Sequence, residues 1–177
     1  MMVSQKVNLR EKRLEDAPDD YAWRKDPELA RLDAVAPLTS RFSEYLPSFK
    51  EELEHPTPQQ RRFAIDTDDG THIGNCMYYN IDTRRGEAEL GIMIGNRAYW
   101  NRGYGTDVVQ ALLRHIFTET TLQRVYLKTL DWNKRAQRCF QKSGLRECQR
   151  LQRNGQRFVV MEIRREDIIE EEARATD

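Results

Sequence analysis

The stretch Tyr99-Trp100-Asn101-Arg102-Gly103-Tyr104-Gly105-Thr106 stands directly before a run of apolar residues at helical spacing. A short Gly-x-Gly loop that opens a helix leaves several backbone N–H groups without helical partners, and the helix dipole lies behind them. This arrangement binds anions, above all phosphate or pyrophosphate. Two glycines in a turn are a weak signal alone, so the interpretation depends on the segments to either side.

Both sides of this loop carry regular patterns. Residues 87–94 predict a strand upstream, and residues 105–119 predict a helix with an apolar stripe. A further strand is predicted over 124–130, and a second helix over 134–143 that ends at Gly144. The loop therefore joins a strand to a helix, as a phosphate-binding loop requires.

The rest of the chain supplies strands and short helices. An alternating strand is predicted over 7–10, and helical pieces fill residues 16–55. Each proline in that region is expected to start or stop a helix, and the four are Pro18, Pro27, Pro37 and Pro47. Further strands are predicted over 62–66, 72–80, 147–152 and 156–163, the last two joined by the hairpin signal Asn154-Gly155.

The resulting order is strand, helices, three strands, helix, strand, helix and two strands. It predicts a mixed α/β fold of the α+β type, with closely spaced strands that favour an antiparallel meander. A doubly wound Rossmann fold is excluded, because its βαβ units would start at the N-terminus. We expect one domain over residues 1–165 and an acidic tail over 166–177.

The composition fits a globular protein of one domain. The chain has 177 residues, 38% hydrophobic and 33% charged, and its 29 Lys and Arg balance 29 Asp and Glu. This balance speaks against nucleic acid and membrane partners. Residues 1–10 lack the apolar region of a signal peptide, so a cytoplasmic location is expected. The odd number and the spacing of Cys76, Cys139 and Cys148 speak against disulfides and a metal site.

Three segments, 86–92, 99–106 and 133–145, together resemble the GNAT superfamily of acetyl-coenzyme A-dependent N-acetyltransferases. Within it, the chain is most similar to the ribosomal-protein N-terminal acetyltransferase-like branch, in which Trp100 replaces the more common Arg or Gln. The resemblance spans residues 7–163. It implies a single-domain GNAT fold with a mostly antiparallel sheet that splays between strands 4 and 5. There the segment Leu90 to Ile94 would diverge from the segment Val125 to Leu130.

The same resemblance implies acetyl-coenzyme A as co-substrate and no metal. The backbone of the loop would hold the pyrophosphate, with Arg102 and Arg97 as cations, and the splay would receive the pantetheine arm. The implied cofactor-binding residues are Ile92, Met93, Ile94, Arg102, Gly103, Tyr104, Gly105, Thr106, Asn133, Arg135, Ala136, Phe140 and Lys142. Without a cofactor, the glycines would be ordinary turn residues and Asn133 an ordinary helix N-cap.

Acetyl transfer to an amine needs a base and a donor to the developing oxyanion. Glu89 is the predicted base, and the alternative for it is an exposed carboxylate at a strand edge. A backbone N–H near Met93 or Ile94 is the predicted oxyanion donor. Phe140 stands where many members of the family carry a tyrosine that protonates the thiolate. The thiolate would then take its proton from water or from another tyrosine, and the candidates are Tyr99, Tyr104 and Tyr126.

The helical region before residue 55 is expected to wall the acceptor pocket. It offers the rings of Tyr21, Trp23, Phe42, Tyr45 and Phe49, and the nearby carboxylates are Glu44, Glu51, Glu52, Glu54 and Asp66. A peptide N-terminus, a polyamine, an aminoglycoside and a free amino acid all stay open as acceptors. Structural or solvent-facing roles are expected for His55, His72 and His115.

Two functions of different class follow. The first is an N-acetyltransferase that works by direct attack of a primary amine on acetyl-coenzyme A in a ternary complex. The second is a catalytically silent acyl-coenzyme A-binding sensor or interaction module, which the missing tyrosine at Phe140 favours. The C-terminal hairpin offers an edge for a homodimer.

Overall fold

The computed structural model describes residues 2–3 and 6–168 of the chain. The strands are β1 (Met2–Val3), β2 (Val7–Glu11), β3 (Arg61–Thr67), β4 (His72–Asp82), β5 (Glu87–Ile94), β6 (Arg124–Leu130), β7 (Arg146–Arg153) and β8 (Gln156–Arg164). The helices are α1 (Ala17–Lys25), α2 (Pro27–Leu32), α3 (Phe42–Glu54), α4 (Tyr104–Glu119) and α5 (Lys134–Lys142), with 3₁₀ turns η1 (Leu14–Asp16) and η2 (Arg97–Tyr99).

The eight strands of this described part form one sheet in the order β1-β2-β3-β4-β5-β6-β8-β7. Neighbours are antiparallel except β5 and β6, which run parallel and pair only through Glu87, Ala88 and Glu89. Beyond Glu89 the two strands separate, so the rest of β5 lacks a partner on that side. The predicted fold and its splay are confirmed. The splay, predicted between strands 4 and 5, lies between β5 and β6, because the short strand β1 was not predicted and raises each later strand number by one.

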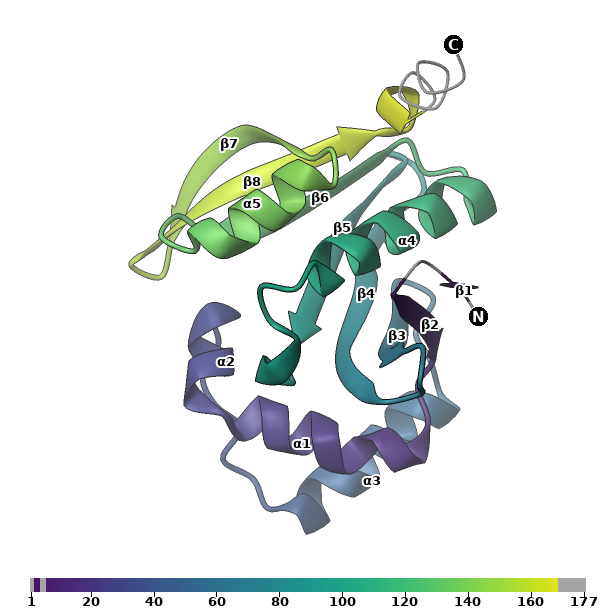
Figure 1. Cartoon of the computed structure of the whole chain (residues 1–177), viewed down its shortest axis with the longest axis vertical. Coiled ribbons are helices and arrows are strands. Elements are labelled where there is room, and N and C mark those ends of the chain that lie inside the picture. Colours follow the sequence, from purple (N-terminus) through teal and green to yellow (C-terminus); the bar gives the residue numbers. More distant parts are fainter. Residues whose placement is uncertain (1, 4–5, 169–177) are drawn as a thin grey trace.

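The main core lies between the sheet and the helices α4 and α5, which run beside each other in Figure 1. The apolar stripe of α4 is buried there, with Val108, Leu112 and Ile116 fully enclosed. From β5, Leu90 and Ile92 belong to this core. Because side chains alternate along a strand, Glu89, Gly91 and Met93 face the other side of the sheet.

Helices α1, α2 and α3 gather away from α4 and α5 (Figure 1). They hold a second, smaller core around Ala17, Tyr45 and Phe49. Pro18 and Pro27 start helices as predicted. The expectation that Pro47 bounds a helix is wrong, because it lies inside α3. A proline there removes one helical hydrogen bond, and the buried Tyr45 and Phe49 on either side of it hold the helix in place.

The C-terminal hairpin turns at Asn154 and Gly155, both with positive φ (52° and 74°), as the Asn-Gly signal predicts. It leaves β7 at the edge of the sheet, and a homodimer through this edge stays a prediction. Residues 165–168 continue as a helical turn. The remainder of the predicted tail, 169–177, lies outside the described residues. No helix within 2–3 and 6–168 has the length and apolar character to cross a bilayer.

Candidate active site

The predicted phosphate loop has the geometry that anion binding requires. Gly103 is the N-cap of α4 with φ +85°, a conformation that favours glycine, and its carbonyl accepts the first helical bond, from the N–H of Asp107 at 3.1 Å. The preceding N–H groups of the first turn therefore have no acceptor within the helix. Gly105 lets α4 approach α5 closely, because a Cβ there would lie 3.2 Å from Sγ of Cys139.

The positive charge near this loop differs from the prediction. The Arg102 guanidinium lies over the rings of Tyr99 and Tyr104, 5.6 and 5.8 Å from their centroids. Arg97 does not serve the loop at all, because Asp26 holds it at 2.8 Å and Glu28 at 2.9 Å.

Lys6 supplies a cation that sequence reasoning missed. Its Nζ donates to the carbonyl oxygen of Arg102 at 3.0 Å, and a Cβ on Gly103 would lie 3.1 Å from it. Lys6 lies almost a hundred residues from the loop in sequence, so only the pairing of the N-terminal strands brings it there.

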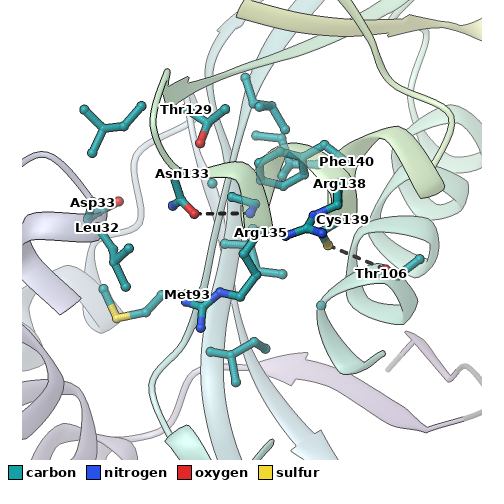
Figure 2. Close-up of a pocket in the computed structure, with 18 of the residues that line it drawn as sticks. Leu32, Asp33, Met93, Thr106, Thr129, Asn133, Arg135, Arg138, Cys139 and Phe140 are labelled. Atoms are coloured by element: carbon teal, nitrogen blue, oxygen red, sulfur yellow. Dashed lines mark hydrogen bonds between the residues drawn. The ribbon is translucent and has the colours of Figure 1, made fainter. Parts of the chain in front are cut away.

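A cavity of about 500 Å³ runs from this loop into the splay between β5 and β6. All of the predicted cofactor residues line it except Arg102, and Arg138 adds a further cation. Figure 2 shows Leu32 and Asp33 on the wall opposite Asn133, Arg135 and Phe140. That wall is the end of α2, which the sequence did not indicate.

Three residues tie the walls of this cavity together. The indole N–H of Trp100 donates to the carbonyl oxygen of Ile94 at 2.7 Å, and the Arg135 guanidinium lies 3.8 Å from the Trp100 ring centroid. Asn133 accepts from the N–H of Ala136 at 3.2 Å and is therefore the N-cap of α5. This observation supports its ordinary structural role but leaves its amide N–H₂ available.

Glu89 is buried, so the alternative of an exposed edge carboxylate is wrong. Its Oε2 lies 2.8 Å from Nζ of Lys128 and accepts from the Asn80 amide at 3.1 Å. Burial and this carboxylate raise the pKa of Tyr79 and Tyr126, so both stay protonated. Glu89 itself lines neither this cavity nor the one described next. Its role as base stays a prediction.

A second cleft, of about 990 Å³, lies among β4, β5 and the N-terminal helices. Of the predicted acceptor-side residues, Trp23, Tyr45, Phe49 and Glu52 line it. The others, Tyr21, Phe42, Glu44, Glu51, Glu54 and Asp66, do not. Tyr21 and Phe42 pack against Tyr45 instead, and Asp66 accepts from Arg10 at 2.6 Å.

We call the cavity of about 500 Å³ the cofactor cavity and the cleft of about 990 Å³ the acceptor cleft, after the residues predicted to line each of them. The two share part of their walls. The residues common to both are Asp33, Tyr79, Gly91, Ile92 and Met93. Neither Asp33 nor Tyr79 was predicted. Asp33 follows α2, a helix of six residues, and nothing in its sequence indicates that the end of this helix lies against the sheet.

The position of Asp33 is set by the end of α2. The N–H of Val35 bonds to the carbonyl of Ala30 at 3.0 Å and that of Ala34 to Arg31 at 3.3 Å, a Schellman cap that puts Ala34 at φ 58°. The Asp33 side chain is solvent-accessible because it faces the cavities, yet protein surrounds it. This desolvation raises the pKa of Asp33 to about 6, although Arg24 counteracts it.

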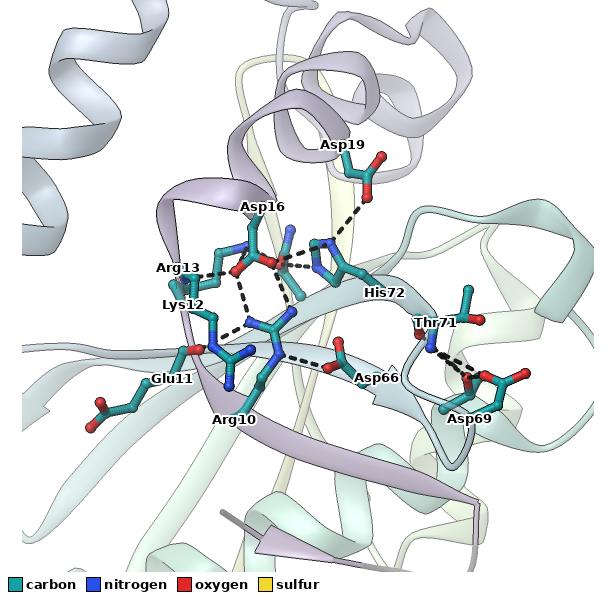
Figure 3. Close-up of polar contacts among 12 residues, drawn as sticks. Arg10, Glu11, Lys12, Arg13, Asp16, Asp19, Asp66, Asp69, Thr71 and His72 are labelled. Atoms are coloured by element: carbon teal, nitrogen blue, oxygen red, sulfur yellow. Dashed lines mark hydrogen bonds and ion pairs between the residues drawn. The ribbon is translucent and has the colours of Figure 1, made fainter.

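A separate polar cluster at the start of α1 has a structural character (Figure 3). Arg10 pairs with Asp16 at 2.8 Å and with Asp66 at 2.6 Å. The Nδ1 of His72 lies 3.3 Å from Asp19, and its Nε2 lies 2.9 Å from the carbonyl oxygen of Gly74. This cluster joins β2, β3, β4 and α1, and it supports the structural role expected for His72.

Known proteins match between about half and four fifths of this chain in sequence. An uncharacterised N-acetyltransferase, p20, from Bacillus licheniformis is 30% identical over 155 residues, 81% of this chain and 84% of that protein. The spermine/spermidine N(1)-acetyltransferase of Bacillus subtilis strain 168 is 27% identical over 100 residues, 54% of this chain and 66% of that enzyme.

Solved structures share the fold. The spermidine N-acetyltransferase of Vibrio cholerae, in complex with CoA and spermine, has a TM-score of 0.82 at 20% identity, covering 92% of this chain and 98% of that one. The aminoglycoside acetyltransferase AAC(6')-Ib, in complex with coenzyme A, has a TM-score of 0.77 at 18% identity, covering 93% and 98%.

The acetyltransferase (GNAT) domain family matches residues 6–146. The loop at the start of α4, the splayed strands and the cavity between them fit the pyrophosphate and the pantetheine arm of the coenzyme. The chain therefore belongs to the GNAT family of acetyltransferases, enzymes that take their acetyl group from acetyl-coenzyme A.

Proposed function

We propose that this enzyme acetylates a primary amine of a small cationic molecule, by direct attack of the amine while both substrates are bound. The observation that carries the proposal is the shared wall of the two cavities, formed by residues that include Asp33 and Tyr79. A thioester in one cavity and an amine in the other would meet only there. Holding both in one place supplies much of the rate enhancement.

The residues for the coenzyme have separate tasks. The first turn of α4 would bind the pyrophosphate, with Lys6, Arg138 and Lys142 as cations near it. The unpaired edge of β5 and the Asn133 amide would bind the amides of the pantetheine arm. The thioester activates the acetyl group, and a backbone N–H near Met93 or Ile94 would donate to the oxyanion.

Direct attack is favoured over an acetylated enzyme, because no cysteine or serine belongs to the shared wall. Cys139 lines the cofactor cavity and Cys76 the acceptor cleft. Burial raises the pKa of both thiols, so neither is an activated thiolate. The proton that the departing thiolate needs can come from the attacking amine itself, which makes Phe140 compatible with turnover.

The lining of the acceptor cleft carries cations as well as carboxylates, and Asp33 is the carboxylate that supports a cationic acceptor. Asp20 is paired with Lys12 at 2.6 Å and Glu52 with Arg62, so these carboxylates are already neutralised. Asp33 makes no ion pair or hydrogen bond through its carboxylate within the described residues. Relatives named for spermine, spermidine and aminoglycosides make polyamines the first acceptors to test. A peptide N-terminus, as in the ribosomal-protein branch, is the next candidate.

Thiol release from acetyl-coenzyme A across a panel of polyamines, aminoglycosides, amino acids and N-terminal peptides tests this proposal. The panel is run with wild type, with Gly103→Glu and with Gly70→Glu. Both glycines have nearly the same φ, +85° and +83°, so both variants carry the same charge and the same backbone strain, and Gly103→Glu adds a Cβ 3.1 Å from Nζ of Lys6. Only Gly103→Glu puts an anion in the predicted pyrophosphate site.

Acceptor-dependent release that Gly103→Glu abolishes and Gly70→Glu retains is the expected result. No release with any amine, together with intact coenzyme A binding by calorimetry, would contradict turnover and favour the acyl-coenzyme A sensor that Phe140 keeps open. Equal binding by both glycine variants would contradict the phosphate loop itself.

A further inference from the structure

The wall shared by the two cavities contains one carboxylate. Of its five residues, Gly91, Ile92 and Met93 carry no titratable side chain, and Tyr79 is a phenol. Asp33 is therefore the acidic group that both substrates would reach. Glu89 lies in the last residue pair before the splay, outside both cavities, and is already paired with Lys128.

The charged groups around Asp33 leave its carboxylate available. Arg24 on α1 is the cation that acts on it, and Arg24 is shared with the ring of Tyr45, 5.9 Å from the centroid. On its own element, Glu28 is held by Arg97 and Arg31 lies 4.6 Å from the Trp132 ring centroid. Across the cavity, Arg135 lies over Trp100. None of these cations forms an ion pair with Asp33.

We infer that Asp33 is a catalytic residue of the proposed acetyl transfer, which binds the ammonium group of the acceptor and removes its first proton. This inference rests on the proposed function. A primary alkylamine has a pKa near that of lysine, about 10.4, and thus arrives protonated at neutral pH. It has no lone pair for attack until a base removes a proton. A carboxylate at the meeting point of two cavities attracts the cation and also accepts that proton.

The step balances in protons and electrons. The ammonium gives one proton to the Asp33 carboxylate, and the neutral amine nitrogen forms a bond to the acetyl carbon. The C–S bond then breaks, and its electron pair leaves with the sulfur as a thiolate. The nitrogen loses its second proton to that thiolate, which gives the amide and the free thiol. Asp33 returns its own proton to solvent through the open acceptor cleft.

The environment of Asp33 suits this role. Desolvation raises the pKa of Asp33 to about 6, so at neutral pH the carboxylate is mostly charged yet basic enough to accept a proton from the bound ammonium. The Schellman cap at Ala34 fixes the carboxylate at the end of α2. The pKa of Tyr79 is raised, in part by the charge of Asp33 itself, so the phenol beside Asp33 stays protonated.

The test compares Asp33→Asn with Asp33→Glu and with Asp68→Asn, a matched change at an exposed turn between β3 and β4. Steady-state kinetics with the best acceptor are measured from pH 5 to pH 10. Asp33→Asn should lower kcat/KM for the amine about 100-fold at pH 7, the size of a lost general base. The KM for acetyl-coenzyme A should change less than 3-fold. Asp33→Glu should recover part of the activity, and Asp68→Asn should match wild type.

The pH profile separates a base from a residue that only binds. Wild type should show an acidic limb with an apparent pKa near 6, and this limb should be absent in Asp33→Asn. The deficit of Asp33→Asn should shrink toward pH 10, because a growing share of the amine is already neutral as the pH approaches its pKa of about 10.4. A deficit that is the same at every pH would overturn the assignment.

A competing assignment and the failure of the proposed function have their own signatures. An acidic limb that Asp33→Asn keeps and Glu89→Gln loses would transfer the role to Glu89. Wild type that turns over no amine would defeat the proposed function, whereas active wild type with equally active Asp33→Asn would defeat only this inference.

Discussion

The Nζ of Lys128 lies 2.8 Å from Oε2 of Glu89, just past the point where β5 and β6 stop pairing. The Glu89 side chain is 6% exposed and that of Lys128 is 34% exposed. The Lys128 side chain thus covers the Glu89 carboxylate at the place where the hydrogen-bonded pairing of β5 and β6 ends. If Lys128 is removed, the buried carboxylate keeps the Asn80 amide and the hydroxyls of Tyr79 and Tyr126 as hydrogen-bond partners but loses its cation.

We expect Lys128→Met to lower the free energy of unfolding by about 2 kcal/mol, less than for a fully buried pair because Lys128 is partly solvated. The double variant Glu89→Gln/Lys128→Met removes both charges and should recover at least half of that loss. Urea unfolding of the two variants and wild type measures the difference. If Lys128→Met unfolds at the same urea concentration as wild type, the pair does not stabilise the splay.

The sequence predicted most of the fold because its elements carry strong local signals. The stripe of α4, the alternation of β5 and the Asn-Gly turn are short-range patterns, and each appears where expected. The same holds for the phosphate loop, where Gly103 needs a positive φ. Such features depend on neighbouring residues only.

What sequence reasoning missed depends on contacts between distant segments. Lys6 and Asp33 reach the site only through the packing of β2 and α2. The alternation of side chains along β5 predicted which face of the sheet Glu89 lies on. It could not predict that Lys128, from β6, covers the Glu89 carboxylate. Pro47 shows the same limit, since tertiary packing overrides a local helix breaker.

Asn133 has an observed role as the N-cap of α5 and a proposed role as a donor to the coenzyme, and the two can be separated. Asn133→Ser keeps a capping oxygen but removes the amide N–H₂, whereas Asn133→Ala removes both. We expect Asn133→Ala to lose about 1 kcal/mol of stability and Asn133→Ser less than half of that. Both should raise the KM for acetyl-coenzyme A at least 5-fold. If Asn133→Ser binds the coenzyme as wild type does, Asn133 is only a cap.

Phe140 is buried and lines the cofactor cavity, at the position where the family resemblance implies a tyrosine acid. If the thiolate takes its proton from the amine, a hydroxyl at this position adds little. Phe140→Tyr should therefore change kcat by less than 10-fold with the best acceptor. Phe140→Leu, which lacks the ring, serves as the packing control. A gain of several hundred-fold in Phe140→Tyr would mean that a missing acid limits the wild-type rate.

Asp16 links stability to pH. Burial alone would raise its pKa, but hydrogen bonds from Arg10 and from the N–H of Arg13, with the charges of Lys12 and His72, lower it overall (Figure 3). A carboxyl whose pKa is lowered by folding adds stability above its unfolded value of about 4. That stability disappears as the pH falls through the lower folded value.

Asp16→Asn should therefore cost about 2 kcal/mol at pH 7, because Arg10 loses its bidentate partner and keeps Asp66 as its anionic partner, with the carbonyl oxygen of Glu11 as a neutral acceptor. The cost should shrink between pH 4 and pH 2, where wild type protonates Asp16 and loses the same interaction. Urea unfolding midpoints at pH 7, 5, 4, 3 and 2 measure this, with the exposed Asp68→Asn as the matched control. A difference that stays constant over this range would mean that Asp16 acts through its shape and not through its charge.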